Sequence, residues 1–363
     1  MSRFRTGLVV GKFAPLHLGH QLVIDMALSQ CDHVVLISWS VPEFPGCEPS
    51  VRSEWLAELY PQTTRLVVDQ DWLTAWSVEN SLDAPTLPSN DDPDVVHRGF
   101  VGWLCTNVLD CVVDAVFTSD DYGPGFAAEL EHWFREQGIA DNTVTHVSVD
   151  RLREAVPISG TKIRESLGSS KQWLSPVVAA SFVKRVTILG GESSGKSTLA
   201  AALAKHCNTE WVPEYGRELW DIRNGVLSYA DLLLIATEQV RRETQAARTP
   251  RVLESGILIC DTSPLTTLLY CLDMFNQAEP ELHALATRTY DLVVLCSPDF
   301  AFVQDGTRRD DTFRITQHAW YQNELAIRSI PYIVANGPVQ NRIESVSHAF
   351  ATIQNRDVER KQC

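Results

Sequence analysis

The sequence predicts an α/β protein that is built from two doubly wound parallel-sheet domains. Three observations lead to this prediction. The chain has 363 residues, which is enough for two domains with separate cores. Short apolar runs alternate with helix-forming runs, a pattern that is typical of parallel sheets covered by helices. Each half of the chain also contains a glycine-bearing turn that joins an apolar run to a helix-forming run.

We place the first domain at residues 1–168, a linker at 169–183 and the second domain at 184–363. The linker begins next to a Gly-Ser-Ser run, and Pro176 interrupts the segment that follows. Each domain is then long enough to bury a core of its own.

Composition and charge exclude several classes of protein. The content of 44% hydrophobic and 21% charged residues is ordinary for a soluble globular protein, and no apolar run is long enough to span a membrane. Residues 1–168 hold 11 Lys and Arg against 24 Asp and Glu, a net charge of −13. Because such a domain repels a phosphate backbone, we expect no nucleic-acid partner. Nine cysteines without a C-x-x-C pair indicate reduced thiols and a cytoplasmic protein.

The strongest motif lies at the start of the second domain. Residues 190–198 read Gly-Gly-Glu-Ser-Ser-Gly-Lys-Ser-Thr, which is the G-x-x-x-x-G-K-S pattern of a phosphate-binding loop. An apolar run precedes it and a helix-forming run follows it, as the motif requires. Glycines let backbone N–H groups turn toward phosphate oxygens, and a helix start adds partial positive charge. The candidate ATP-binding residues are Gly190, Gly191, Glu192, Ser193, Ser194, Gly195, Lys196, Ser197 and Thr198.

Acidic and basic residues elsewhere in this domain complete the predicted phosphoryl-transfer site. Lys196 is expected on the outer phosphates of ATP, and Ser197 on Mg²⁺. Asp261 ends the apolar run 256–260 in the manner of a Walker B strand, so we expect it to bind Mg²⁺ as well. Glu214 follows the predicted strand 209–212 and is the better candidate for the general base. Arg308 lies in a charged loop that is expected to close as a lid, with a solvated turn as the alternative.

The first domain opens with a second strand–turn–helix unit. A predicted strand at 7–11 leads into a turn that carries His17 and His20, and an apolar helix is predicted at 21–29. Both histidines would lie near a helix N-terminus, where they could contact phosphate. The alternative is a pair of ordinary turn histidines. A zinc site is disfavoured because no Cys and His group with ligand spacing completes it.

Two signatures in this domain resemble those of the nucleotidyltransferases. Residues 11–20 match G-[KR]-F-x-P-x-H-x-G-H, and residues 158–164 match I-S-x-T-x-I-R. Both occur in the expected order, about 140 residues apart, which is more specific than either alone. The resemblance implies a Rossmann-like fold with catalytic and ATP-binding residues in both signatures. These are Lys12, His17, His20 and Arg164 for charge stabilisation, and Gly11, Phe13, Ser159 and Thr161 for ATP.

The rest of the chain supplies the alternating elements. Strands are predicted at 32–39, 65–69, 114–118 and 143–149, and helices at 48–60, 95–109 and 125–137, with a loop at 83–94. In the second domain we predict strands at 292–296 and 332–335 and a helix at 228–248, opened by a capping box at Ser228. Trp103 is our candidate for stacking on a base, although a place in the core is the ordinary alternative for any tryptophan here.

Taken together, the chain resembles the NadR-like bifunctional family, a nicotinamide-mononucleotide (NMN) adenylyltransferase followed by a P-loop ribosylnicotinamide kinase. Besides the signatures above, the resemblance rests on residues 118–123, 214–218, 261–262 and 305–308. It implies that ATP phosphorylates ribosylnicotinamide to NMN, and that a second ATP adenylylates NMN to NAD and pyrophosphate, with Mg²⁺. It also makes Tyr215 and Arg217 candidates for substrate binding.

Two departures and two alternatives stay open at this point. The family often has Glu where Asp120 stands, and the chain starts close to its first strand, so we do not expect the repressor role of members with a DNA-binding domain. Another transferase–kinase fusion, such as one for flavin synthesis, or a nucleotide-sensing regulator would share parts of the pattern. The intact motif residues speak against a regulator. Small-molecule substrates are the expected partners, and the sequence is compatible with a homo-oligomer.

Overall fold

The computed structural model describes residues 3–119, 122–139, 143–306 and 308–360. The chain divides into two compact units, residues 1–181 and 182–363. Each unit is an α/β structure with a five-stranded sheet, so the predicted fold class is confirmed. Asp120, Asp121 and Thr307, to which the sequence analysis drew attention, lie outside the described residues.

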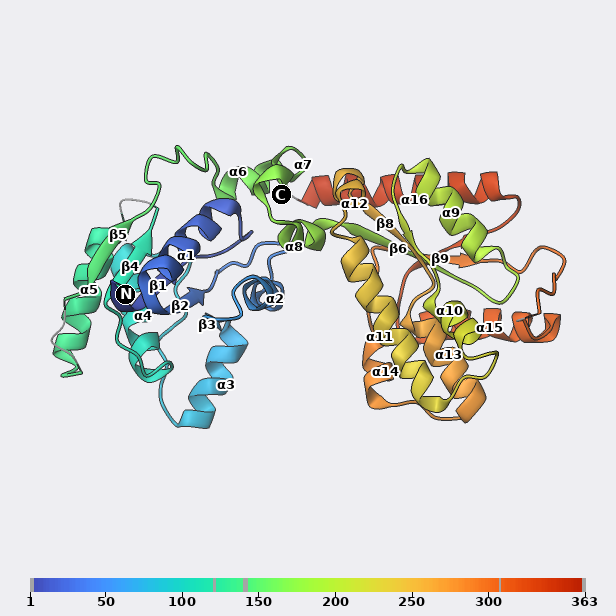
Figure 1. Ribbon diagram of the computed structural model, residues 1–363, viewed down its shortest axis with the longest axis horizontal. Helices are drawn as coiled ribbons and strands as arrows, with labels where there is room; N and C mark the ends of the chain where they lie inside the picture. Colours follow the sequence, from blue (N-terminus) through green and yellow to red (C-terminus); the bar gives the residue numbers. More distant parts are fainter. Residues whose placement is uncertain (1–2, 120–121, 140–142, 307, 361–363) are drawn as a thin grey trace. The chain divides into compact units, whose positions relative to one another are not determined.

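The sheet of the first unit is parallel and has the strand order β3-β2-β1-β4-β5 (Figure 1). Leu8 in the central strand faces Val35 on one side and Val116 on the other. The strand order reverses between β1 and β4, and the carboxyl ends of parallel strands form a ligand crevice at such a point. The strands are β1 (Phe4–Val10), β2 (Cys31–Ser38), β3 (Thr64–Val67), β4 (Ala115–Thr118) and β5 (Thr145–Ser148).

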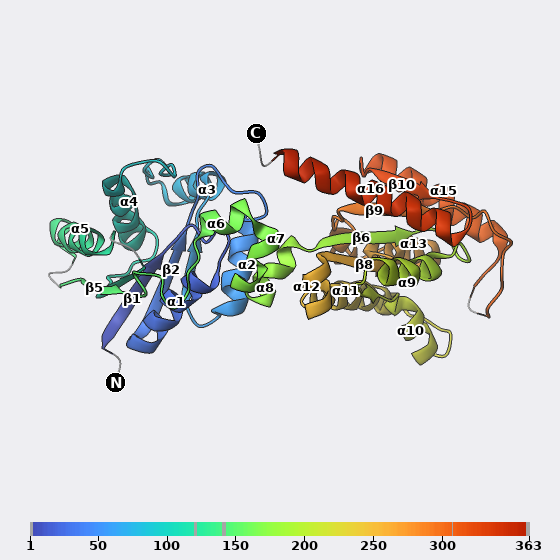
Figure 2. The ribbon, with the colours of Figure 1, turned by 90° about the horizontal axis from the view of Figure 1, so that it is seen from above.

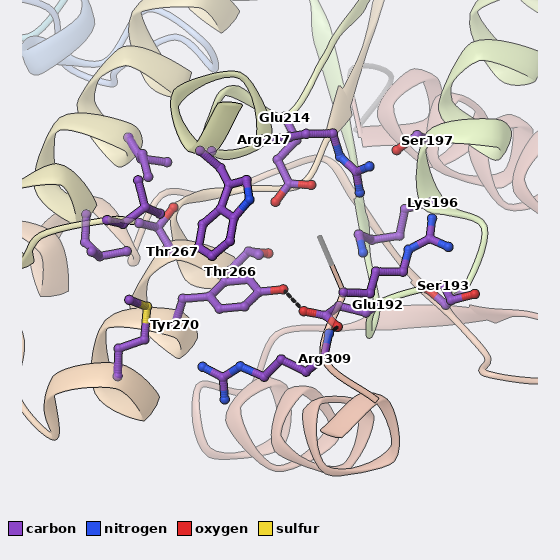
Figure 3. Close-up of a pocket in the computed structure, with 18 of the residues that line it drawn as sticks. Glu192, Ser193, Lys196, Ser197, Glu214, Arg217, Thr266, Thr267, Tyr270 and Arg309 are labelled. Carbon is purple, nitrogen blue, oxygen red and sulfur yellow. Dashed lines mark hydrogen bonds between the residues drawn. The ribbon is translucent and has the colours of Figure 1, made fainter. Parts of the chain in front are cut away.

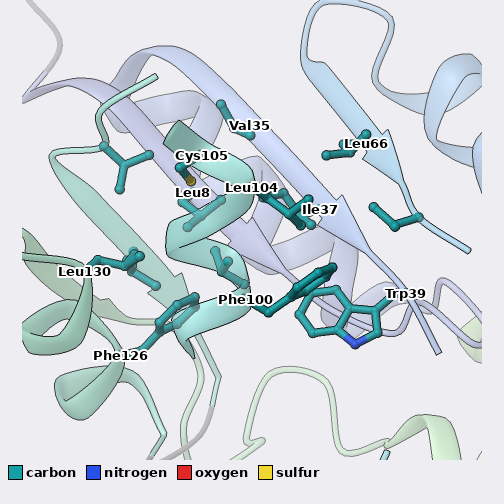
Figure 4. Close-up of a cluster of buried hydrophobic side chains, with 14 of the residues drawn as sticks. Leu8, Val35, Ile37, Trp39, Leu66, Phe100, Leu104, Cys105, Phe126 and Leu130 are labelled. Atoms are coloured by element: carbon teal, nitrogen blue, oxygen red, sulfur yellow. The ribbon is translucent and has the colours of Figure 1, made fainter. Parts of the chain in front are cut away.

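Helices of the first unit bury an apolar cluster against this sheet. Leu8 and Ile37 from the strands pack with Phe100 and Leu104 of α4 and Phe126 of α5 (Figure 4). The helices are α1 (Leu18–Gln30), α2 (Pro49–Leu59), α3 (Gln70–Asn80), α4 (Asp94–Asn107), α5 (Gly123–Glu136), α6 (Gly160–Glu165), α7 (Leu167–Ser170), η1 (Lys171–Trp173) and α8 (Pro176–Ala179); η2 (Ala180–Phe182) spans the division between units.

The second unit has the strand order β10-β9-β6-β8-β7, again fully parallel. Figure 2 shows β9, β6 and β8 side by side, with β6 in the centre. Since β6 leads into the phosphate-binding loop, this loop lies at the middle of the carboxyl edge. The strands are β6 (Lys184–Leu189), β7 (Trp211–Val212), β8 (Ile257–Asp261), β9 (Leu292–Cys296) and β10 (Tyr332–Ala335).

Both faces of this second sheet are covered by helices. Leu199 of α9 and Val346 of α16 pack on one face with Ile188, while Leu268 of α13 and Tyr321 of α15 pack on the other with Leu189. The helices are α9 (Lys196–His206), α10 (Tyr215–Ile222), α11 (Tyr229–Ala246), α12 (Pro250–Ser255), α13 (Pro264–Phe275), α14 (Pro280–Leu285), α15 (Asp311–Ile327) and α16 (Val339–Arg360).

Several features differ from the sequence prediction: helices α10 and α12 to α16 of the second unit were not predicted, and three differences concern the first unit. Helix α1 begins at Leu18 instead of residue 21, because His17 caps it. Helix α3 was not predicted, although the Asp69 side chain accepts a hydrogen bond from Trp72 N at its start. Residues 169–181, where we placed most of the linker, form short helical turns within the first unit. Within the described residues, no helix combines the length and the apolar character that crossing a membrane requires.

Candidate functional site

The phosphate-binding loop of the second unit joins β6 to α9 through two glycines with positive φ. Gly190 has φ 146° and Gly195 has φ 82°, conformations that side chains disfavour. A Cβ on Gly190 would also lie 2.7 Å from Ser194 Oγ. Gly195 is the N-cap of α9 and offers no side-chain cap. The first N–H groups of α9 therefore remain available for an anion.

Two side chains of this loop bond to the backbone of the loop itself. Lys196 Nζ donates to the Gly191 carbonyl at 3.1 Å, and Ser194 Oγ donates to the same carbonyl at 2.7 Å. The Lys196 ammonium is thereby held over the loop, where a phosphate chain bound by the backbone N–H groups would meet it.

Asp261 and Ser197 meet at the end of β8 and the start of α9. A hydrogen bond from the Ser197 hydroxyl and the charge of Lys196 oppose the burial that raises the pKa of Asp261. Asp261 is 2% exposed, and its Oδ1 is buried without a hydrogen-bond partner among the described residues. An unsatisfied buried carboxylate oxygen beside a hydroxyl suits Mg²⁺, which takes one or two protein oxygens and completes its shell with phosphate and water. The described residues contain no group of three metal-ligating side chains, so phosphate oxygens would have to share the ion.

A cavity of about 260 Å³ opens beside this loop (Figure 3). Lys196, Ser197, Glu214 and Arg217 line it with polar and charged groups. Burial raises the pKa of Glu214, and the charge of Lys196 opposes that shift. Apolar and aromatic side chains also line the cavity, namely those of Trp220, Leu227, Leu232, Ile235, Tyr270 and Met274. The cavity thus suits a ligand that carries both a hydroxyl and a flat or apolar group.

A second cavity, of about 310 Å³, also borders the loop and is lined by Phe300, Ala301, Val339 and Arg342. The Arg342 side chain is 1% exposed and lies 4.4 Å from the centre of the Phe300 ring. It donates to Ser194 O at 2.7 Å and to Gly337 O at 2.9 Å, and it pairs with Asp299. The two cavities share Ser193, Gly195, Thr198 and Arg308, so two ligands could meet at the loop.

The charged loop after β9 contributes the remaining cations. Arg308 and Arg217 each pair with Asp305 Oδ2 at 3.1 Å. Arg308 lines both cavities, as expected for a lid arginine. Sequence reasoning had placed Arg217 near substrate, and the structure puts it in the first cavity.

In the first unit, His17 and His20 together cap helix α1. Gly19 N donates to His17 Nδ1 at 3.1 Å, and His17 N donates to His20 Nδ1 at 3.5 Å. The two rings stack with their centres 3.8 Å apart, and Phe13 meets His20 edge-on at 5.2 Å. The pair therefore satisfies the helix N-terminus that the sequence analysis had left for phosphate.

The electrostatic surroundings of this pair favour neutral imidazoles. Burial, followed by the charges of Arg153 and Arg164, lowers the pKa of His17 to about 4. Burial and the charge of His17 hold the pKa of His20 well below its usual value. Burial also lowers the pKa of Lys12, and Arg164 contributes to that shift. Three cations thus surround two uncharged histidines, an arrangement that would attract an anion.

Arg164 brings the two transferase signatures together. Ser159 accepts a hydrogen bond from Lys162 N at the start of α6, and Arg164 on that helix donates to Ala14 O at 2.5 Å and to Thr161 Oγ1 at 3.1 Å. Its guanidinium lies 3.9 Å from the centre of the Phe44 ring. The signatures, about 140 residues apart in sequence, therefore meet at the carboxyl end of β1.

Two other predicted substrate residues, Tyr215 and Trp103, have aromatic surroundings or cationic partners that the structure describes. Tyr215 is not among the residues that line either cavity; its ring lies 4.4 Å from the Arg242 guanidinium. Trp103 packs at the margin of the core, 5.3 Å from Trp76 between ring centres.

Sequence reasoning also missed several residues that the structure brings to these sites. They are Arg153, Trp220, Thr266, Thr267 and Tyr270. Trp220 lies three residues after Arg217 on α10, and that helical spacing was a signal that could have found it. Nothing local in the sequence marks the other four residues.

The chain is similar to known proteins in both sequence and structure. The AAA domain family model matches residues 185–342. The chain is 28% identical over 318 residues to the trifunctional NAD biosynthesis/regulator protein NadR of Escherichia coli (strain K12), covering 83% of this chain and 71% of the relative. The Salmonella typhimurium protein of the same name gives the same values.

Two solved structures share the fold across both units. A NadR protein in complex with NR has a TM-score of 0.65 at 21% identity, and a NadR protein in complex with NAD and AMP-PNP has 0.62 at 20%. Each comparison covers 96% of both chains.

Proposed function

We propose that this NadR-like chain makes NAD in two consecutive ATP-dependent steps. A kinase domain, which we assign to residues 184–363 of the second unit, would phosphorylate ribosylnicotinamide to NMN. A transferase domain, which we assign to residues 1–168 of the first unit, would adenylylate NMN to NAD, with residues 169–183 between the two domains. The names of the relatives support NAD biosynthesis, and the bound NR, NAD and AMP-PNP of the solved structures support these ligand classes.

The observation that carries the proposal is the set of side chains that line the first cavity. The Lys196 ammonium and the Glu214 carboxylate line the same cavity as the aromatic side chains of Trp220 and Tyr270. A ribosylated pyridine matches both kinds of group, with a primary hydroxyl at one end and a flat cationic ring at the other. Aromatic faces attract such a ring through stacking and cation–π interactions.

Phosphoryl transfer would then proceed without a covalent enzyme intermediate. The 5′-oxygen forms a bond to the γ-phosphorus of ATP while the bond to ADP breaks, and the hydroxyl proton passes to Glu214. Lys196 and Arg308 stabilise charge on the transferring group. Mg²⁺, held by Ser197 and Asp261, would offset charge on the outer phosphates. The second cavity, with Phe300 and Arg342, would hold the adenine of ATP.

Adenylyl transfer in the first unit would likewise depend on position and charge. A 5′-phosphate oxygen of NMN forms a bond to the α-phosphorus of ATP, and the bond to pyrophosphate breaks. Lys12, Arg164 and Arg153 lie where they could bind the triphosphate, and His17 and His20 could donate hydrogen bonds to it. Gly11, Phe13, Ser159 and Thr161 shape this site. The product of the kinase is the substrate of the transferase, so one chain could perform both steps.

The proposal is tested by following products directly. The purified chain is incubated with ATP, Mg²⁺ and either ribosylnicotinamide or NMN, and NMN, NAD and pyrophosphate are quantified. Ribosylnicotinamide should yield NMN and then NAD, while NMN should yield NAD with an equal amount of pyrophosphate. Loss of ATP without either product would contradict the proposal and favour a regulator.

A further inference from the structure

Glu192 occupies a variable position of the phosphate-binding loop, and its carboxylate turns away from the loop backbone. Its Oε1 accepts a hydrogen bond from the Tyr270 hydroxyl at 3.0 Å, as Figure 3 shows. Its Oε2 accepts one from Arg309 N at 2.7 Å. The backbone N–H of Glu192 donates to the Gln317 side chain at 2.8 Å. Both carboxylate oxygens therefore have donors from outside the loop.

Glu192 is among the predicted ATP-binding residues as part of the loop, and the motif assigns no role to its side chain. A carboxylate repels phosphate, and it is stabilised near a phosphate site only when donors or cations hold it. Here the donors come from α13 on one side and from the segment 299–310 on the other. Tyr270 and Arg309 both line the first cavity, and Arg309 follows the lid arginine Arg308 in the sequence.

The segment 299–310 has further anchors near the same point. Val303 N donates to Ser193 Oγ at 3.0 Å, so the adjacent loop residue also holds this segment. The Arg309 guanidinium pairs with Asp273 of α13 at 2.6 Å and lies 4.1 Å from the Phe313 ring centre. Of these contacts, those of Glu192 join the Tyr270 hydroxyl to the backbone of the segment through one carboxylate.

We propose that Glu192 is a positioning residue that couples closure of the 299–310 segment to an occupied acceptor cavity. This inference depends on the kinase half of the proposed function. An acceptor that packs on the Tyr270 ring fixes the position of the Tyr270 hydroxyl. That hydroxyl then orients the Glu192 carboxylate, and the carboxylate accepts the hydrogen bond from Arg309 N. The segment then closes over the loop and keeps water from the γ-phosphate.

Loss of this coupling should produce a specific side reaction, the hydrolysis of ATP by water. Water can attack in place of the acceptor: its oxygen bonds to the γ-phosphorus, the bond to ADP breaks, and the protons leave to solvent. In Glu192→Ala the segment loses its bond from Arg309 N and no longer closes in response to the acceptor, so water reaches the γ-phosphate. The ratio of ATP hydrolysis to phosphoryl transfer should rise about tenfold, the scale of losing a hydrogen bond to a charged group. KM for the acceptor should rise more than KM for ATP.

The experiment compares the wild type with Glu192→Ala, Glu192→Gln, Tyr270→Phe and the exposed control Glu254→Ala. ADP and NMN are measured with ATP, Mg²⁺ and varied ribosylnicotinamide. Glu192→Gln should restore most of the coupling, because its amide oxygen accepts the same bond from Arg309 N. Glu254→Ala should match the wild type. A rise in KM for ATP with an unchanged ratio would overturn the proposal, since Glu192 would then act on ATP.

A second readout needs no acceptor and separates the two proposals. Hydrogen exchange of peptides containing Arg309 should be about tenfold faster in Glu192→Ala, because its amide loses its acceptor. Exchange in β8 should not change. If the wild type does not phosphorylate ribosylnicotinamide, the proposed substrate is wrong. The exchange result still shows whether Glu192 accepts the hydrogen bond from Arg309 N. Unchanged exchange at Arg309 would overturn the role of Glu192 whatever the substrate.

Discussion

The two strand–turn–helix units of this chain prepare a helix N-terminus for phosphate in opposite ways. In the second unit, α9 begins at Gly195, whose lack of a side chain leaves the first N–H groups uncapped. In the first unit, His17 and His20 cap α1 with their own rings. One helix start is open, whereas the other already carries its hydrogen-bond acceptors.

The charges follow the same contrast. Lys196 brings an ammonium to the loop and bonds only a backbone carbonyl there. The histidines of the first unit are uncharged at neutral pH, since burial and neighbouring cations lower their pKa values. A bound triphosphate would reverse part of that effect, because a nearby anion favours the protonated form. In the proposed function, the second unit would meet phosphate with the Lys196 ammonium, whereas the first unit would gain positive charge when its triphosphate binds.

The largest effect is expected from Lys196→Ala. Phosphorylation of ribosylnicotinamide should fall by about 10³-fold or more, because the outer phosphates lose their cation. Adenylylation of supplied NMN should stay close to the wild-type rate, and Lys205→Ala, an exposed change on the same helix, should affect neither step. Both rates are measured on the same preparations. Loss of both activities in a folded Lys196→Ala protein would show that the two sites are coupled and would break the comparison.

His20→Ala tests the first unit in the same manner. Adenylyl transfer should fall about 10²–10³-fold, the scale for one preorganised donor, and kinase activity should remain. The exposed His33, which contacts Thr64, provides a matched His→Ala control. Steady-state rates with NMN and ATP measure the effect, and thermal unfolding checks the fold. An unchanged rate would remove His20 from the catalytic group.

A metal titration distinguishes the two carboxylates of the second unit. Asp261→Asn should raise the Mg²⁺ concentration for half-maximal kinase rate about 10–100-fold, because its unpaired oxygen suits the ion. Glu214→Gln should lower kcat at saturating Mg²⁺ with little change in that concentration. If only Glu214→Gln alters the Mg²⁺ requirement, the roles of the base and the metal ligand are reversed.

The smallest effect concerns stability and pH. The pKa of His17 is lowered to about 4 in the folded chain, so the unfolded chain takes up the proton first as the pH falls. The contribution of a neutral His17 to the free energy of unfolding is complete above about pH 6.5. It is lost as the pH falls from about 6.5 to 4. For His17 alone this loss is ~2 kcal/mol at pH 5.

The variant His17→Asn isolates this term, because asparagine keeps an N-cap acceptor but does not titrate. Urea unfolding of the full chain at pH 7.5 and pH 5 should show a smaller loss of stability for the variant than for the wild type. Arg153 and Arg164, whose charges act on His17, and His20, which stacks on it, stay unchanged. Equal losses in both proteins would mean that His17 is not held neutral by its surroundings.

Local motifs carried most of the fold prediction. The strand before Gly190 and the helix after Gly195 lie as the motif required, because the loop works only in that context. The capping box at Ser228 was also correct. Helix α3 was missed because Gln70–Asn80 lacks a clear apolar period, so that only the cap at Asp69 marked its start.

The sites were less predictable where contacts come from distant segments. The bond from Tyr270 to Glu192 spans 78 positions, and the bond from Arg309 spans 117, so no window of sequence contains both partners. Tyr215 lies beside a cavity-lining helix position, but its ring faces Arg242. Neighbouring positions on a helix point in different directions, so two residues of one motif can face different partners. A motif match alone does not show which of them faces the cavity.

Arg342 has a consequence for the order in which the chain becomes functional during synthesis. This one side chain from α16 bonds Ser194 O in the phosphate-binding loop, Ser297 O after β9 and Gly337 O. The loop itself leaves the ribosome about 150 residues earlier. The Ser194 carbonyl therefore stays solvated, without its bond from Arg342, until almost all of the second unit has been translated. The first unit ends at residue 181, so all of its residues are translated before those of the second unit. In the proposed function, the residues of the transferase site would thus be complete in the nascent chain well before Arg342 reaches the kinase site.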